Sequence, residues 1–123
     1  MPPAPYQISA VHNFLHVALP PGFRLALDEL GALWRDIRAA CSTRGLRHVL
    51  IEGEQAVRHL APDDVPQHAA LISGHDSPLR VAYCLYDYPA DHLTRQFVAD
   101  ANRGRSSVQV FDQLDPALRW LGA

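Results

Sequence analysis

A short apolar segment constrains the fold more strongly than any other feature of the sequence. Residues 80–86 read RVAYCLY, a run of small, β-branched and aromatic side chains bounded by Pro78 and Pro89. Such a run is typical of a β-strand, and proline on either side limits its length. We therefore expect residues 80–86 to form the central strand of a sheet.

Two apolar runs near the start of the chain predict a β-hairpin. They cover residues 6–11 and 14–19 and are separated by His12-Asn13, a plausible turn pair. Further along, the β-branched run 48–51 predicts a strand buried on both faces, and residues 107–111 predict the last strand.

The clearest helical period follows Pro20-Pro21-Gly22. Its apolar stripe consists of Ala26, Leu30, Leu33, Trp34, Ile37, Ala40 and Cys41. Asp28 and Glu29 lie in the first turn, as the helix dipole prefers, and Gly45 can take the left-handed conformation just past the end. The sequence thus predicts a helix that ends near Arg44.

Three weaker helical patterns lie between and after the later strands. One covers about residues 64–73, and a long connection from Glu52 to Pro62 precedes it. The next has Pro89 in its first turn and ends at Arg103-Gly104. The last follows Asp112, which can cap its first turn.

This order of elements predicts an α/β fold. We expect a single mixed, mostly parallel sheet of about five strands, with an N-terminal hairpin, four helices and right-handed crossovers. Residues 1–5 are rich in proline and are predicted to form a short extended tail. Residues 6–123 are predicted to form a single domain.

The charged residues exclude several functions. The net charge is −2, and the 11 basic residues are all arginines without a dense run, which argues against nucleic-acid binding. The absence of lysine removes Schiff-base catalysis and the lysine of phosphate-binding loops. The sequence also has no glycine-rich phosphate loop, no nucleophile elbow and no dinucleotide fingerprint.

The cysteines and the N-terminal segment predict a cytoplasmic protein. Cys41 and Cys84 fall in a predicted helix and a predicted strand, which does not suggest a secreted disulfide framework. The first residues lack the basic and apolar regions of a signal peptide, and no apolar run has the length of a membrane span. We therefore expect no integral membrane association.

Two segments together resemble the STAS-like family, also called SpoIIAA-like domains after a sporulation anti-sigma-factor antagonist. They are the strand RVAYCLY and the ending VQVFDQLDPALRWL, and the similarity spans about residues 8–121. The matching positions are Arg80, Val110-Phe111, Ala117, Trp120 and Leu121. The resemblance implies a non-enzymatic binding or regulatory domain of bacterial type, which engages a protein partner or an apolar small molecule such as a lipid.

The resemblance also implies a partner-binding segment after the third strand. Antagonist-like members carry a phosphorylatable serine there, in a segment of the type Asp-Ser-Ser-Gly. The segment here contains Glu52, Gly53, Glu54 and Gln55, without a hydroxyl group, which argues against a kinase-controlled switch of that type. A segment that is always negative would be a different device. Glu52, Gly53 and Glu54 are the candidate partner-binding residues, and ordinary solvated loop carboxylates are the alternative.

A ligand site is predicted where the strand 80–86 ends, because open α/β sheets bind ligands at the carboxyl ends of their strands. Tyr86 and Asp87 close this strand, and His92 and Arg95 follow within the first turns of the next helix, where they can help to hold an anion. The alternative role of Asp87 is to cap that helix.

A gap between a helix and the sheet is a second possible position for an apolar ligand. Trp34, Tyr83, Tyr86 and Phe97 are the aromatic side chains expected near such a gap. The alternative is that these side chains only fill the core, since aromatic residues at helical and strand periods usually do so.

Seven histidines raise the question of a metal site. His12 and His16 are separated by the predicted turn, while His68 and His75 have no cysteine or acidic partner at a recognised ligand spacing. We therefore predict no metal and no cofactor. Cys84 is a possible nucleophile, but within a strand it more simply acts as a small buried hydrophobe.

Two other classes of function are open alternatives. One is a small hydrolase or transferase whose site contains Asp87, His92 and Arg95, at the carboxyl end of the central strand. The other is a homodimer that serves as an assembly module, because a sheet that starts with a hairpin exposes an edge strand.

Overall fold

The computed structural model describes residues 6–73 and 78–122, and the predicted tail 1–5 lies outside these ranges. The main sheet consists of β1 (Gln7–Val11), β2 (Phe14–Ala18), β4 (His48–Glu54), β6 (Arg80–Tyr86) and β7 (Ser107–Phe111), in the spatial order β1-β2-β4-β6-β7. β1 is antiparallel to β2, and the other neighbours pair in parallel. The predicted mixed, mostly parallel sheet with an N-terminal hairpin is confirmed.

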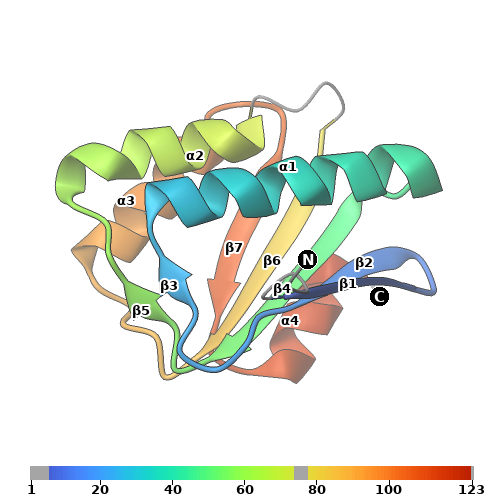
Figure 1. Cartoon of the computed structure of the whole chain (residues 1–123), viewed down its shortest axis with the longest axis horizontal. Coiled ribbons are helices and arrows are strands. Elements are labelled where there is room, and N and C mark those ends of the chain that lie inside the picture. The colour runs from blue at the N-terminus through green and yellow to red at the C-terminus, as the bar shows by residue number, and fades with distance from the viewer. Residues whose placement is uncertain (1–5, 74–77, 123) are drawn as a thin grey trace, which may run out of the picture.

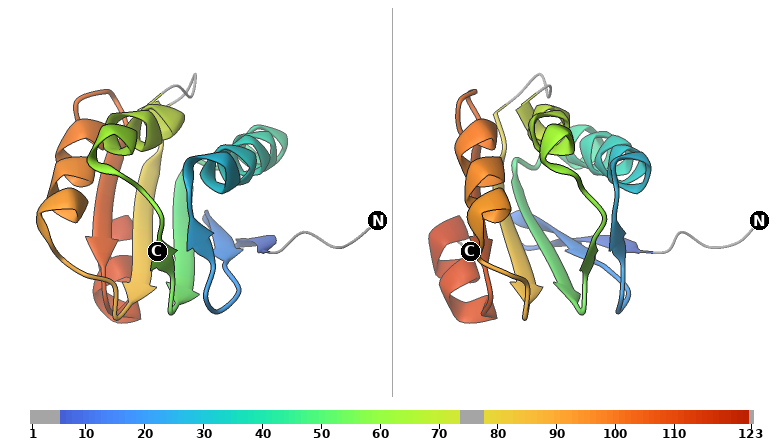
Figure 2. Two further views of the ribbon diagram at one scale, coloured as in Figure 1. Left: turned by 60° about the vertical axis from the view of Figure 1, so that its left-hand side comes forward. Right: turned by 90° about the vertical axis from the view of Figure 1, so that its left-hand side faces the viewer.

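Four α-helices of the described chain cover the two faces of the sheet. They are α1 (Leu27–Arg44), α2 (Val65–Ser73), α3 (His92–Ala101) and α4 (Leu114–Leu121). In Figure 1, α1 and α2 lie in front of the strands and α4 lies behind them. Figure 2 shows the same layers from the side. The predicted α/β fold with four helices is therefore confirmed.

The alternation of side chains along β4 and β6 gives each face of the sheet its own core. On one face, Val49 and Tyr83 pack in the larger core with side chains of α1, α2 and α3. On the other face, the smaller core contains Phe14, Leu50, Ala82, Cys84, Ala117 and Leu121, of which the last two belong to α4. Both strands are buried on both sides, as expected for parallel strands between helices.

A second, two-stranded sheet was not predicted from the sequence. β3 (Arg24–Leu25) and β5 (Val57–Arg58) pair in parallel, and the amide of His59 donates to the Leu25 carbonyl at 3.0 Å. The expected long connection from Glu52 to Pro62 is wrong in two respects. β4 continues to Glu54, and β5 follows it.

The segment RVAYCLY is a strand over the predicted residues, but it is not the middle strand. β6 lies between β4 and β7, whereas β4 occupies the centre of the five-stranded order. The reason is that the N-terminal hairpin adds two strands on the far side of β4.

Two predicted helix starts are also wrong. α3 begins at His92 instead of at Pro89, and its cap is Asp91, whose side chain accepts a hydrogen bond from the Thr94 amide at 3.1 Å. Asp87 does not cap α3, and it has a left-handed backbone with φ 61°. The cap of α4 is Gln113 instead of Asp112, and its side chain makes no capping hydrogen bond.

The predicted end of α1 is confirmed and gives a test of the backbone geometry. Gly45 has φ 66°, and its amide donates to the Cys41 carbonyl. We expect Gly45→Ala to lower the free energy of unfolding by about 1 kcal/mol, because a Cβ disfavours the left-handed conformation. Urea unfolding of the purified variant measures this change.

Gly31→Ala is the matched control on the same helix. Gly31 lies inside α1, and a Cβ added there meets no atom within 4 Å. Alanine favours a helix interior over glycine by about 1 kcal/mol, so this variant should be more stable than the wild type. Equal effects of the two substitutions would contradict the assigned backbone at Gly45.

Candidate functional site

An apolar pocket lies on the face of the sheet that carries α2 and α3. It is lined by Leu25, Arg58, Leu60, Val65, His68, Tyr83, Leu85, Tyr88, Leu93, Thr94, Phe97 and Val110. The space open to the centres of water molecules is about 30 Å³. One water centre needs roughly 10–15 Å³, so the pocket as it stands admits only small groups.

A chain of hydrogen bonds between buried side chains runs behind this pocket. Nε1 of Trp34 in α1 donates to the Tyr83 hydroxyl at 3.1 Å. The same hydroxyl lies 3.1 Å from Nε2 of His68 in α2. The His68 ring stacks on Phe97 of α3, with 4.1 Å between ring centroids. These hydrogen bonds therefore connect α1, β6 and α2, and ring stacking on Phe97 adds α3.

Burial keeps the polar groups of this chain uncharged. It lowers the pKa of His68 to about 3, and it raises the pKa of the Tyr83 hydroxyl. Burial removes the imidazolium or the phenolate from water, and no opposite charge among the described residues compensates for this. This is the physical reason for the direction of both pKa shifts. At neutral pH, His68 is therefore a neutral imidazole and Tyr83 a neutral phenol.

An ion pair closes the rim of the pocket. The Arg58 guanidinium donates two hydrogen bonds to the Asp91 carboxylate, at 2.8 and 2.5 Å. These hydrogen bonds are the main reason why the pKa of Asp91 is well below its usual range. The guanidinium also lies 5.9 Å from the centre of the Tyr88 ring. Because Asp91 caps α3, the pair connects β5 to the start of that helix.

A second hollow adjoins the pocket at the carboxyl ends of β6 and β7. It is lined by Leu85, Tyr88, Pro89, Ala90, Val110, Phe111 and Asp112, and its volume is about 240 Å³ by the same measure. Leu85, Tyr88 and Val110 line both spaces. These three side chains therefore separate the small inner pocket from a larger outer hollow.

A polar cluster lies on the opposite face of the sheet. The Tyr86 hydroxyl donates to Oε2 of Glu52 at 2.5 Å, and Nε2 of His16 lies 2.9 Å from Oε1 of the same carboxylate. The hydrogen bond to Glu52 is the main reason why the pKa of Tyr86 is raised. The His16 and Glu52 side chains are 28% and 25% exposed, so this cluster is in contact with solvent.

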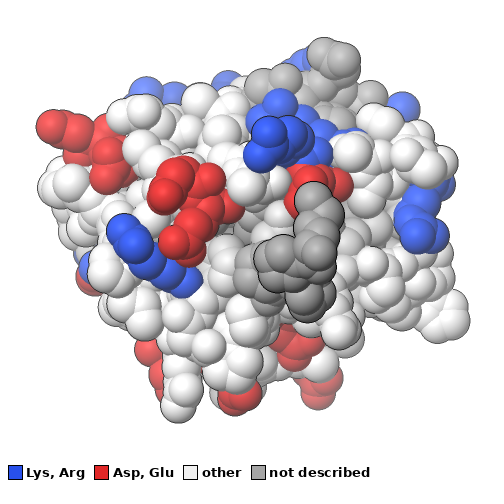
Figure 3. Space-filling model, in the orientation of Figure 1, with Lys and Arg blue, Asp and Glu red and all other residues white. Residues whose placement is uncertain are grey.

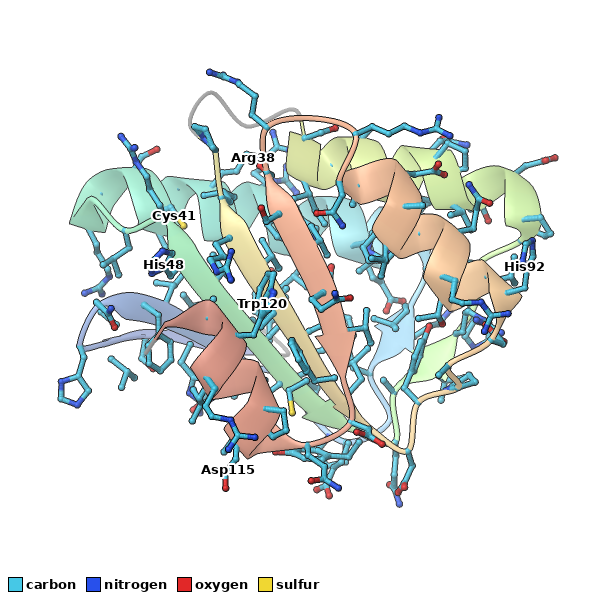
Figure 4. All side chains as sticks on the ribbon, turned by 180° about the vertical axis from the view of Figure 1, so that it is seen from behind. Arg38, Cys41, His48, His92, Asp115 and Trp120 are labelled. Carbon is cyan, nitrogen blue, oxygen red and sulfur yellow. The ribbon has the colours of Figure 1, made fainter. Side chains whose placement is uncertain are left out.

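The four predicted ligand-binding residues do not line the apolar pocket. Tyr86 belongs to the polar cluster, and Asp87 is exposed in the turn after β6. His92 is exposed at the outer end of α3, away from the sheet (Figure 4). Arg95 is exposed and donates to the Ala90 carbonyl at 3.0 Å. Among the residues described, no hydrogen bond or ion pair joins Asp87, His92 and Arg95 to one another.

The three predicted partner-binding residues lie in a strand instead of a loop. Glu52 is half-buried, and its carboxylate is occupied by His16 and Tyr86. Gly53 is buried, and a Cβ added there would lie 3.1 Å from Cβ of Leu19. Glu54 alone of the three is exposed. The interpretation of Glu52 as a loop carboxylate is therefore wrong, because Glu52 lies in β4 and its carboxylate is paired.

Of the four aromatic side chains expected near a gap, two line the pocket, and the alternative that they fill the core holds for Trp34, Tyr83 and Phe97, which are all buried in the larger core. Tyr83 and Phe97 line the pocket, while Trp34 is fully buried behind it. Tyr86 lies on the opposite face, because residues an odd number of positions apart in a strand point to opposite sides.

Sequence reasoning missed His68 and Arg58 as pocket residues. His68 precedes Ile72 by four positions, so the helical period placed it on the inner side of α2. Arg58 had no such signal, because the two-residue strand that positions it has no recognisable pattern.

The remaining candidates for chemistry are buried or lack partners. Cys41 and Cys84 are free thiols inside the two cores, and burial raises the pKa of both. In residues 6–73 and 78–122, no three histidine, cysteine or acidic side chains are close enough to hold a metal ion. His75, a candidate ligand in the sequence, lies outside the described residues.

The surface charges are mixed on the face that carries α1 and α2. Figure 3 shows acidic and basic side chains interspersed there, without a broad area of one sign. No helix in the described part of the chain is both long enough and apolar enough to cross a membrane. Comparisons with protein-family models, curated proteins and solved structures find no match to this chain.

Neutral, buried His68 predicts a pH dependence of stability. The folded state holds His68 with a pKa of about 3, and the unfolded chain returns it to its ordinary value of 6.5. Stability from this group is therefore fully present above pH 6.5 and is lost as the pH falls toward 3. We expect a slope of up to about 1.4 kcal/mol per pH unit, measured by urea unfolding in steps across this window.

His68→Gln should reduce that slope by up to about 1.4 kcal/mol per pH unit, which corresponds to one proton. His92→Gln is the matched control, because the exposed His92 side chain is in water in both the folded and the unfolded state. Equal slopes for wild type and His68→Gln would show that the imidazole is not held in its neutral form.

Proposed function

We propose that this chain is a STAS-like binding domain without enzymatic activity, and that it binds an apolar small molecule in the pocket between α2, α3 and the sheet. The observation that carries the proposal is the pocket itself. Its walls are mostly aliphatic and aromatic, while a small number of polar side chains stand at defined positions. This combination is typical of sites for small organic ligands, where apolar contact gives affinity and a few polar groups give orientation.

The order of elements also supports the STAS-like assignment. A hairpin is followed by parallel strands that alternate with helices, and the chain closes with a short helix on the far face. Since fold does not determine function, the binding role rests on the pocket and not on this order.

The size of the closed pocket indicates how a ligand would enter. The inner space is about 30 Å³, and the adjoining hollow is about 240 Å³. Tyr88 lines both spaces and is half-buried at the surface. Because Leu85, Tyr88 and Val110 all line both spaces, a ligand larger than a few atoms would enter by displacing these side chains.

The protein-partner alternative concerns the end of β4. Of the residues that the resemblance suggests, Glu54 is exposed while Gly53 is buried. A partner would therefore meet Glu54 and the neighbouring turn, not the whole segment. Native mass spectrometry of protein purified from its own host separates the two roles, because a released apolar compound supports the ligand and a bound protein supports the partner.

The enzyme and homodimer alternatives have weaker structural support. The residues proposed for an enzyme site, Asp87, His92 and Arg95, are all exposed and make no direct contact that would orient one by another. The homodimer would use β1, which is an edge strand of the sheet. Sedimentation of a monomer at high concentration would remove that alternative.

The pocket is tested by filling it. Leu93 of α3 is half-buried and lines the pocket, and Leu93→Trp places a larger side chain there. Titration with toluene, followed by amide shifts in NMR spectra, should show saturable changes at α2 and α3 in the wild type. We expect Leu93→Trp to weaken this binding at least tenfold, because the indole occupies the same space.

Leu118→Trp is the matched control on the opposite face. Leu118 is a half-buried leucine of α4 that packs against the smaller core. Its replacement should leave the affinity for toluene within about twofold of the wild type. The absence of saturable shifts in the wild type, or the same affinity in both variants, would overturn the proposed function.

A further inference from the structure

We infer that the ligand of this pocket carries a neutral hydrogen-bond acceptor, such as a carbonyl or ether oxygen, and that Nδ1–H of His68 donates to it. The inference rests on the proposed function, because it names the chemistry of a molecule bound in the same pocket. It follows from counting the protons of the buried chain formed by Trp34, Tyr83 and His68.

The first step fixes the direction of the hydrogen bonds. The indole Nε1–H of Trp34 can only donate, so the Tyr83 oxygen is its acceptor at 3.1 Å. The Tyr83 hydroxyl has a single proton of its own. Among the described residues, the other atom at hydrogen-bond distance is Nε2 of His68, at 3.1 Å. The hydroxyl proton therefore points to Nε2, which must accept it.

The second step places the proton of His68. A neutral imidazole carries one proton, and a ring nitrogen that accepts a hydrogen bond cannot carry it. His68 is consequently protonated at Nδ1. The opposite tautomer would place three protons around the Tyr83 oxygen and leave its own hydroxyl proton without an acceptor.

The third step asks what accepts from Nδ1–H. Within the described residues, the hydrogen bonds of the His68 ring involve Nε2 only. His68 is 5% exposed and lines the pocket. Nδ1 is not among the described side-chain atoms that are fully buried without a partner, so it is accessible to water, and a ligand acceptor in the pocket can take the place of that water.

The fourth step selects a neutral acceptor over an anionic one. Arg58 is the cationic side chain among the pocket residues, and its guanidinium already gives two hydrogen bonds to Asp91. A carboxylate inside the pocket would therefore lose its water without gaining a free counter-charge. A ligand that only donates would place its proton against Nδ1–H. A neutral oxygen or nitrogen acceptor avoids both conflicts.

The donor is also held in place before a ligand arrives. The Tyr83 hydroxyl fixes one edge of the imidazole, and the ring stacks on Phe97 with an interplanar angle of 18°. A fixed donor loses little freedom on binding, so the hydrogen bond contributes to selectivity as well as to affinity.

Two probes of nearly the same shape test the inference. Cyclopentanone and methylenecyclopentane differ in an oxygen against a methylene group, and both are titrated into the full-length protein by NMR. The ketone is better hydrated than the alkene, so the ketone preference is taken as the ratio of the two affinities in the wild type relative to the same ratio in His68→Phe, which keeps a ring but has no donor. We expect this preference to be about 2- to 10-fold, the range for one net hydrogen bond. The same ratio of affinities in the wild type and His68→Phe would overturn the acceptor while leaving the pocket in place. Failure of both probes to bind would overturn the proposed function as well.

The tautomer of His68 is a second, independent measurement. Long-range ¹H–¹⁵N spectra of the imidazole should show Nδ1 protonated and Nε2 unprotonated in the wild type. The reverse pattern would overturn the inference without any variant or ligand.

A pair of conservative variants completes the test. Tyr83→Phe removes the hydroxyl that holds Nε2, so we expect a mixture of His68 tautomers and loss of the preference for the ketone. Tyr86→Phe is the matched control, because its hydroxyl donates to Glu52 on the opposite face. If Tyr83→Phe kept the wild-type tautomer and the ketone preference, the inferred direction of the hydrogen bonds from Trp34 through Tyr83 to His68 would be overturned.

Discussion

The buried hydrogen bonds from Trp34 through Tyr83 to His68 couple the three helices on one face of the sheet. Each residue comes from a different element, and Phe97 adds the fourth by stacking on the imidazole. A shift of α1 or α2 would leave a donor or acceptor unpaired in an apolar core, which costs more than the hydrogen bond itself contributes. The same chain ends at the wall of the pocket. The relative position of the helices and the chemistry of the pocket thus have a common origin.

The opposite face of the sheet uses its polar groups differently. α4 is held by the Arg80 guanidinium, which lies 3.9 Å from the centre of the Trp120 ring and donates to the Trp120 carbonyl. The helix is short, with eight residues, and the cluster of His16, Glu52 and Tyr86 is in contact with water. Charged groups near water are screened and solvated, whereas the neutral groups of the first face are neither. The proposed apolar ligand would therefore find its selective contact on the first face.

Local patterns in the sequence predicted those parts of the fold that local chemistry determines. The apolar period of α1 and its glycine end, the turn at His12-Asn13 and the strand RVAYCLY all depend on neighbours in the chain. The cap of α3 does not depend on neighbours in the chain alone, because Asp87 and Asp91 are equally good capping residues. Arg58, which is 33 positions from Asp91, forms the ion pair that accompanies the actual cap. The pocket escaped prediction for the same reason, since β5 is held by β3 and not by its own sequence.

The closed volume of the pocket need not set the largest size of the proposed ligand, because part of its rim is an ion pair that opens at low cost. The Arg58–Asp91 pair has side chains that are 22% and 41% exposed, and partly exposed pairs of this kind contribute little to stability. Tyr88 lies at the boundary with the outer hollow, together with Leu85 and Val110. The inner wall is different, since moving His68 or Tyr83 would break buried hydrogen bonds. Under the proposed function, the inner end of the pocket would determine which functional group is recognised, and its rim would determine how large an attached body can be.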